Sequence, residues 1–236
     1  MKFKILINFV SVIVLIAVSF VGGKSSILLA ELICPENGDP CYEEGSRSSS
    51  ISIQIIGPTP GYLLPTNNRP NFSWQPEPGA ETYFISIADF SGIIWDMETA
   101  DTQITYPEDK PPLEPNKDYV LTVETLINNT SKSGEVNFRL LGEEEAEKVE
   151  SAAAEVRNQN NLTAEEKVIK ISEMYEDKRL YSEAIALLNN SLNEGKISPE
   201  IYQTLGNVYR EAGLSFLAES PYQTALELAT NLEDKN

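Results

Sequence analysis

The stretch Tyr202-Gln-Thr-Leu205-Gly206-Asn-Val-Tyr209 decides the C-terminal fold, because its pattern also occurs 34 residues earlier in the chain. The shared positions are mostly apolar or aromatic and recur at spacings of three and four, as on one face of a helix. A period of this length accommodates two helices joined by a turn. The sequence therefore predicts two helix-turn-helix units over 161–232. Their expected core residues are Val168, Ile171, Tyr175, Ala184, Leu188, Tyr202, Leu205, Gly206, Tyr209, Ala218, Tyr222 and Ala225.

Signals for helix ends agree with these units. They are the capping pair Thr163 and Glu166, the start Ser198-Pro199, and the helix-ending residues Gly195 and Gly213. Each type satisfies or avoids the unpaired backbone groups of a helix terminus. Pro221 departs from the pattern, because proline disrupts a helix interior. The last helix is therefore expected either to begin late, near Ser220, or to kink.

The second unit resembles the tetratricopeptide repeat family in Tyr202-x-x-Leu205-Gly206-x-x-Tyr209, followed by Ala218, Tyr222 and Ala225. The first unit departs from that pattern at two positions, with Ser172 in place of Gly206 and Ser191 in place of Ala225. Two repeats are fewer than such modules usually need for stability. We therefore expect a preceding helix, the N-terminal domain or a partner chain to cover one end, with self-association as an alternative.

The resemblance implies that the first helix of each repeat lines a concave groove. Carried over by position, the groove candidates are Glu166, Ile169, Glu173, Glu176, Asp177, Gln203, Asn207 and Arg210, with Glu200 and Glu211 beside them. One interpretation is a solvated helix face. The other is an acidic groove for a basic or extended peptide, with Asn207 hydrogen-bonding to the peptide backbone. A groove for C-terminal carboxylates is not supported, because Glu173 and Glu176 would repel that ligand.

Residues 51–142 show short alternating apolar runs broken by Pro, Gly and Asn. This pattern predicts about seven antiparallel strands stacked as a β-sandwich. After Gly142 the composition shifts to Glu, Ala and Lys, and a connector helix is predicted over 143–160. Its apolar stripe consists of Ala146, Val149, Ala153 and Val156. The expected fold class is α+β in two segregated domains, an all-β sandwich followed by an α-helical tetratricopeptide-type array.

The sandwich resembles fibronectin type III and immunoglobulin-like domains in Phe72-Ser-Trp74-Gln-Pro76 followed by Tyr83, and in the segment Leu113–Tyr119. The resemblance implies that the Tyr119 hydroxyl bonds back to the preceding loop. It implies nothing about function, because this architecture hosts many roles. Trp95 is expected either to belong to the core or, with Tyr62, to form an exposed platform for stacking on sugars or peptides.

The N-terminus has the character of an export signal. Residues 1–30 begin with a basic stretch and continue with an apolar run, which predicts a cleaved signal peptide or a retained membrane anchor. Residues 31–50 are expected to be a linker in which Cys34 and Cys41 form a disulfide, the default in an oxidising compartment. The predicted location is periplasmic or extracellular.

Composition argues against catalysis. The chain has no histidine, which removes the usual proton-transfer group near neutral pH and the commonest metal ligand. Phosphate-loop, dinucleotide and calcium-loop motifs are also missing from the sequence, so no cofactor and no metal are expected. The net charge of −18 disfavours nucleic acids and anionic lipids, whose binding depends on cationic contacts.

The leading hypothesis is an exported, non-enzymatic interaction or scaffold protein that uses the helical groove to bind a protein or peptide. The acidity of the chain is explained either by solubility alone or by a basic partner. The alternative is adhesion or cell-envelope polysaccharide binding through the sandwich. The chain also resembles secreted cyanobacterial proteins that carry a domain of unknown function. That resemblance rests on Arg69-Pro-Asn-Phe-Ser-Trp74, on Pro112–Pro115 with Tyr119, and on Tyr181-Ser-Glu-Ala-Ile185.

Overall fold

The structure is a computed structural model that describes residues 14–18, 27–33, 42–43 and 52–233. The chain divides into two compact units, 1–50 and 51–236. In the first unit, three strands form an antiparallel sheet in sequence order: β1 (Val14–Val18), β2 (Ile27–Ile33) and β3 (Tyr42–Glu43).

Several N-terminal predictions fall outside what the structure describes. Strands β1 and β2 occupy part of the predicted signal segment, and the rest of that segment lies outside the described residues. The same holds for Cys34 and Cys41 and for most of the predicted linker. Within the described part of the chain, no helix combines the length and the hydropathy needed to cross a membrane.

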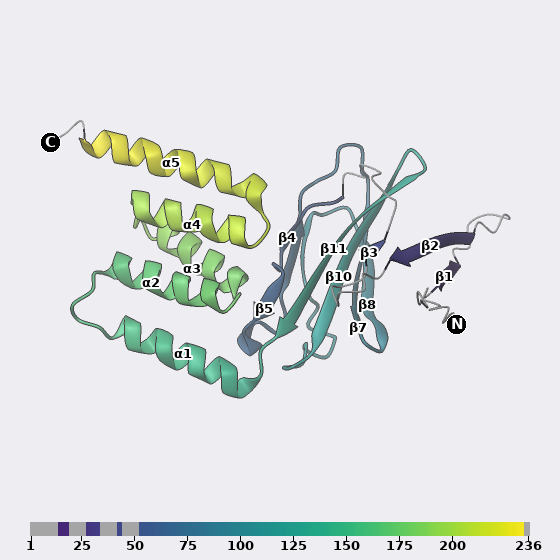
Figure 1. Ribbon diagram of the computed structural model, residues 1–236, viewed down its shortest axis with the longest axis horizontal. Coiled ribbons are helices and arrows are strands. Elements are labelled where there is room, and N and C mark those ends of the chain that lie inside the picture. Colours follow the sequence, from purple (N-terminus) through teal and green to yellow (C-terminus); the bar gives the residue numbers. More distant parts are fainter. Residues whose placement is uncertain (1–13, 19–26, 34–41, 44–51, 234–236) are drawn as a thin grey trace, which may run out of the picture. The chain divides into compact units, whose positions relative to one another are not determined.

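The second unit begins with a β-sandwich of two sheets (Figure 1). The larger sheet has the order β5-β11-β10-β7-β8 and the smaller has the order β4-β6-β9. Strand β5 runs parallel to β11, and the other pairs are antiparallel. The strands are β4 (Ile55–Gly57), β5 (Gly61–Leu63), β6 (Asn71–Trp74), β7 (Tyr83–Asp89), β8 (Gly92–Thr99), β9 (Gln103–Thr105), β10 (Asp118–Ile127) and β11 (Thr130–Leu140).

Alternation along these strands builds the sandwich core. Ile85 and Ile87 of β7 are fully buried and belong to the same core cluster as Phe72 and Trp74 of the opposite sheet. The neighbouring Phe84 lies on the opposite face of β7 and is exposed, as the period of two requires. This arrangement supports the predicted immunoglobulin-like fold, with one additional short strand, β5, beyond the seven expected.

Two aromatic side chains settle questions that the sequence left open. The backbone N–H of Glu114 donates to the Tyr119 hydroxyl over 2.8 Å, which confirms the expected return contact to the preceding loop. Trp95 is only 7% exposed and packs against Phe72 and Tyr106, with ring centroids 5.8 and 5.6 Å apart. The expectation that Trp95 belongs to the core is therefore confirmed, and the alternative of an exposed stacking platform is wrong, because the inward position of Trp95 on β8 places the indole in the core.

Five helices follow the sandwich: α1 (Glu143–Arg157), α2 (Ala164–Asp177), α3 (Tyr181–Asn193), α4 (Pro199–Glu211) and α5 (Ser215–Glu233). Sheets in the N-terminal part and helices in the C-terminal part confirm the α+β class, and both belong to one compact unit. The predicted stripe of α1 is buried. A hydrogen bond of 2.8 Å from the Tyr175 hydroxyl to the Glu150 carboxylate joins α2 to α1.

Helix ends follow the sequence signals with one exception. Thr163 and Glu166 form the capping box, and the Ser198 side chain accepts from the N–H of Ile201. Gly213 adopts a left-handed conformation (φ +80°) just after α4. Helix α5 begins at Ser215 and continues through Pro221, so the late start near Ser220 is wrong.

The repeat positions lie in the helical core, more deeply in the first helix pair than in the second. All five positions of the first pair are buried, whereas Tyr202, Tyr209 and Tyr222 are half-buried. Gly206 lies directly against the Tyr222 ring, because a Cβ atom there would be 2.6 Å from a ring carbon. Close approach of α4 and α5 therefore requires glycine at this position.

Candidate functional site

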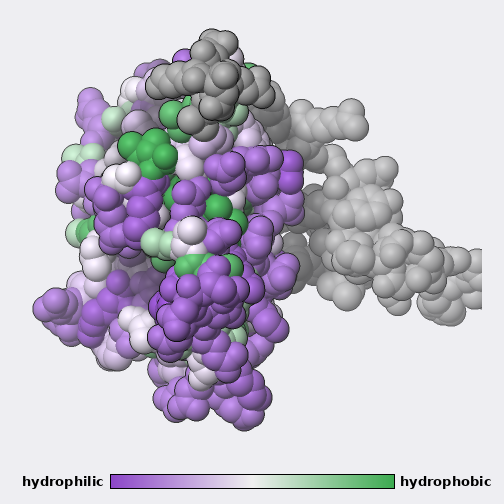
Figure 2. All heavy atoms as spheres, turned by 90° about the vertical axis from the view of Figure 1, so that its left-hand side faces the viewer, coloured by the Kyte–Doolittle hydropathy of each residue, from purple (hydrophilic) through white to green (hydrophobic). Residues whose placement is uncertain are grey.

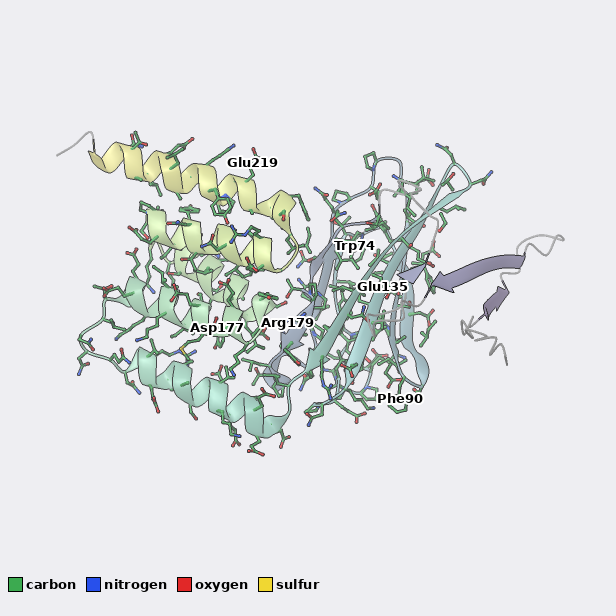
Figure 3. The ribbon with its side chains drawn as sticks, in the orientation of Figure 1. Trp74, Phe90, Glu135, Asp177, Arg179 and Glu219 are labelled. Atoms are coloured by element: carbon green, nitrogen blue, oxygen red, sulfur yellow. The ribbon has the colours of Figure 1, made fainter. Side chains whose placement is uncertain are left out.

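The sandwich and the helices are joined by a polar seam. It is formed by residues 59–64 of the sandwich and by residues 179–183, which comprise the end of the α2–α3 turn and the first residues of α3. The N–H of Tyr62 donates to the Arg179 carbonyl over 2.9 Å, and the hydroxyls of Thr59 and Ser182 are 2.8 Å apart. A Cβ atom at Gly61 would be 2.4 Å from the Arg179 carbonyl oxygen. The two backbones therefore touch without room for a side chain, and Figure 3 shows Arg179 at this junction.

A carboxyl group is buried within the seam. Glu183 Oε1 accepts from the backbone N–H of Leu64 over 2.8 Å, whereas Oε2 is buried without a hydrogen-bond partner. Loss of hydration raises the pKa of Glu183 to about 7, although the N–H of Leu64 opposes the shift. The Glu150 carboxylate adds a smaller contribution that also raises this pKa. The seam is therefore most stable with Glu183 protonated.

Apolar contacts continue the seam into the helical core. Leu64 and Leu141 from the sandwich belong to the same buried cluster as Val149 of α1 and Leu180, which precedes α3. The N–H of Leu141 also donates to the carbonyl of Leu63 over 2.9 Å, which holds the start of α1 near β5. Burial of this kind contributes about 25 cal/mol for each Å² of apolar surface. Helix α1 and the sandwich therefore cover the first helix pair.

The predicted groove residue Glu176 of α2 lies close enough to Arg210 and Glu211 of α4 for their charges to act on it. Burial raises the pKa of the Glu176 carboxyl, and the charges of Glu211, Asp177 and Glu173 raise it further, while Arg210 lowers it. The Arg210 guanidinium donates to Glu211 over 3.2 Å. The cluster is therefore an acidic strip whose nearby cation is already engaged.

Other groove candidates are held in other roles. Glu166 accepts from the N–H of Thr163 over 2.7 Å, and this bond holds the pKa of the Glu166 carboxyl below its ordinary value. Ile169 is half-buried against the helical core. The Tyr222 hydroxyl donates to Asn207 Oδ1 over 2.8 Å, while Gln203 is exposed on α4. The structure thus brings together the acidic C-terminal ends of α2 and α4 rather than the whole predicted set.

Asp177 lines a separate hollow beside the first turn of α1. The hollow has a volume of about 580 Å³ and an apolar floor that includes Val149 and Met174. Its charged rim includes Glu144 and Lys148, whose side chains pair over 2.6 Å. This hollow has no signal in the sequence, because residues far apart in the chain form it.

The surface of the helical module is largely hydrophilic. Figure 2, which faces the left-hand side of Figure 1, shows hydrophobic side chains only as small separate groups among hydrophilic ones. Within the described part of the chain, no group of three or more acidic, cysteine or histidine side chains is placed to hold a metal ion. The charged side chains that stand out on this surface are carboxylates, which lie along the helices and strands.

Comparisons with known proteins give likenesses to β-sandwich structures. No family model matches the chain, and no curated protein matches it. A fibronectin-III-like protein from Clostridium thermocellum is 19% identical, with a TM-score of 0.27, over 36% of this chain and 90% of its own. The fibronectin-III domain of human collagen alpha-1(XX) is 19% identical, with a TM-score of 0.28, over 42% and 94%. CopC from Methylosinus trichosporium OB3b is 16% identical, with a TM-score of 0.27, over 38% and 92%.

Proposed function

We propose that this chain is an exported, non-enzymatic interaction protein that binds a basic, extended peptide in the groove between α2 and α4. The observation that carries the proposal is the cluster of Glu173, Glu176 and Glu211, in which Glu176 is half-buried among like charges. A cationic side chain placed there would oppose the like charges of Glu211, Asp177 and Glu173, which add to the effect of burial in raising the pKa of Glu176. A bound lysine or arginine would therefore supply the positive charge that these carboxylates lack in the free protein.

Helix boundaries support a tetratricopeptide-type module. Helices α2 and α4 end at Asp177 and Glu211, and α3 and α5 begin at Tyr181 and Ser215. The ends of α2 and α4 are 34 residues apart, and so are the starts of α3 and α5. This distance is the period of this repeat type. Repeats of this type stack into extended concave binding surfaces.

A peptide backbone would find a donor at Asn207. Its Oδ1 is occupied by the Tyr222 hydroxyl, so the free part of the side-chain amide is the NH₂ group. That group donates hydrogen bonds and suits a peptide carbonyl. The groove thus offers carboxylates for side chains and an amide for the main chain.

The proposal also holds that the protein is exported, that it catalyses no reaction and that it needs no cofactor. The apolar N-terminal run supports export, and the lack of histidine supports a binding role over catalysis. The likeness to secreted cyanobacterial proteins stays a prediction. The alternative role in polysaccharide binding loses both expected stacking residues, because Trp95 is buried and Tyr62 packs against the helical core.

The test is capture from an envelope extract of the source organism with the full chain as bait. The groove variant is Glu173→Gln with Glu176→Gln. Its matched control is Glu219→Gln with Glu227→Gln, which removes two exposed charges from α5. We expect a basic protein to be retained by the wild type and the control and lost by the groove variant. Equal retention by all three would overturn the groove assignment.

A further inference from the structure

The outward face of the larger sheet carries a row of residues in direct register. Phe84 of β7 pairs with Glu98 of β8 on one side and with Glu124 of β10 on the other. Residues paired in this way point to the same face of a sheet. The inner face at this level holds Tyr83 and Ile85, which are buried, so the row points outward. An aromatic ring thus lies between two carboxylates.

The neighbouring outward row also carries two carboxylates. It runs across four strands as Asp96, Ser86, Thr122 and Glu135. Glu135 is labelled on β11 in Figure 3. We call the four exposed carboxylates and the ring they surround the acidic sheet face. Its members are Asp96, Glu98, Glu124, Glu135 and Phe84.

Within these two rows there is no compensating cation. None of the four carboxylates makes an ion pair with any residue that the structure describes. The nearby Lys132 is paired with Glu77 over 2.6 Å, and its register partner Thr125 is buried. Lys132 therefore points away from the acidic sheet face.

The ring of Phe84 borders a shallow hollow. The hollow has a volume of about 330 Å³, and Glu98, Glu124 and Leu126 also line it. Phe84 is 41% exposed and Leu126 is 65% exposed, an apolar floor left open to solvent between two carboxylates. A cation above an aromatic ring is attracted to its face, and the aliphatic stem of lysine or arginine covers apolar surface.

We propose that the acidic sheet face binds a lysine- or arginine-rich extended segment of a partner protein, with one cationic side chain over Phe84. The charge selects this occupant, because a second copy of the chain would present like charges that repel. Spacing fits as well. Side chains two residues apart on an extended segment are about 6.6 Å apart, which matches Asp96 and Glu98 on β8. The site lies on the sandwich and does not depend on the helical groove.

The probe is an extended peptide of about ten residues in which lysine and threonine alternate, so that every second side chain is a cation. It is titrated into the full chain while NMR follows the ring signals of Phe84, assigned with the variant Phe84→Leu. We expect a saturable shift at low salt that weakens as salt is added. In Glu98→Gln with Glu124→Gln, the titration midpoint should rise about tenfold.

The variant Glu219→Gln with Glu227→Gln is the matched control, because it removes two exposed charges from α5, outside both proposed binding surfaces. Its midpoint at Phe84 should change by about twofold or less. Equal changes in both double variants would reduce the effect to general charge and overturn the proposal. Phe84 signals that do not move would also overturn it, as would signals that move on dilution of the protein alone, which would assign the face to a second copy. Failure at Phe84 leaves the groove test unaffected.

Discussion

The two helix pairs share one sequence period but differ where the sandwich meets them. Arg179, Ser182 and Glu183 of the seam correspond, 34 residues later, to Gly213, Phe216 and Leu217. The first set accepts hydrogen bonds from the sandwich, whereas Gly213 has no neighbour within 4 Å of a would-be side chain. The first helix pair therefore carries the contacts to the sandwich, and the second has glycine and apolar residues at the corresponding positions.

Backbone conformation shows what these contacts cost. Arg179, which follows α2, has a φ of +56°, and Gly213, which follows α4, has a φ of +80°. Both residues are therefore in the left-handed region. Glycine adopts it freely, but a residue with a Cβ atom is strained by about 1 kcal/mol. Arg179 is held there because its carbonyl accepts from Tyr62. In the first helix pair, contact with the sandwich thus holds a left-handed residue where the second pair uses glycine.

The largest expected effect is that of Gly61→Ala, which breaks the docked pair. The new Cβ atom would be 2.4 Å from the Arg179 carbonyl oxygen, on a backbone with a φ of +123°. We expect a loss of about 3 kcal/mol in the free energy of unfolding, from overlap plus backbone strain. Urea denaturation of the full chain measures it.

Gly92→Ala is the control for that substitution. Its φ is +117°, and nothing lies within 4 Å of the added atom, so it reports backbone strain alone. The difference between the two variants isolates the contact of the seam. Equal losses would show that the two backbones are not in contact.

Gly206→Ala tests the second pair. The added Cβ would be 2.6 Å from the Tyr222 ring, which must move and lose its bond to Asn207. We expect a loss of about 2 kcal/mol. At the equivalent position of the first pair, Ser172→Ala removes only one hydrogen bond and should cost about 1 kcal/mol or less. Thermal unfolding compares them, and the reverse order would contradict the packing described.

Glu183→Gln tests the buried carboxyl of the seam. The pKa of Glu183 is about 7 in the folded protein, above the ordinary value of 4.5. The folded state therefore holds a proton that the unfolded state releases, and stability falls as the pH rises from 4.5 to 7. The glutamine variant should lose this fall and be more stable than wild type at pH 8, by about 1 to 2 kcal/mol.

The measurement is urea denaturation of both proteins across this pH range. Glu227→Gln, at an exposed position on α5, serves as the control and should leave the pH profile unchanged. A wild-type stability that stays flat from pH 4.5 to 7 would show that Glu183 is solvated.

The smallest expected effect is that of Arg179→Gly, which makes the first pair resemble the second. It relieves the left-handed strain, while a more flexible unfolded chain offsets part of the gain. We expect a net stabilisation of about 0.5 kcal/mol, and a loss of about 1 kcal/mol for the mirror variant Gly213→Ala. If Arg179→Gly destabilises the protein, the arginine side chain contributes to the seam.

Local patterns predicted the repeat and most of its ends. The 34-residue spacing, the capping box at Thr163 and the glycine at 213 act within one or two helical turns, so the sequence shows them directly. The hydrogen bond between the N–H of Glu114 and the Tyr119 hydroxyl was implied by the resemblance of Leu113–Tyr119 to fibronectin type III domains. Pro221 misled the prediction of the α5 start, because packing of α5 on α4 overrides the local preference.

The seam and the acidic sheet face were not predictable in this way. Glu183 meets Leu64 across 119 positions, and no periodicity records that pairing. The row of Glu98, Phe84 and Glu124 needs the register of three strands, which the alternation of single strands leaves open. Only some of the predicted groove residues lie together, and Glu166 is held at the start of α2 by its bond to Thr163.

The most direct test of the groove is an NMR titration of the full chain with an extended, lysine-rich peptide, observed at the Asn207 side-chain amide. We predict a saturable shift whose midpoint rises about tenfold in Glu173→Gln with Glu176→Gln. The midpoint should be almost unchanged in Glu98→Gln with Glu124→Gln. An Asn207 signal that does not move, or that moves equally in both double variants, would contradict the groove as the binding surface.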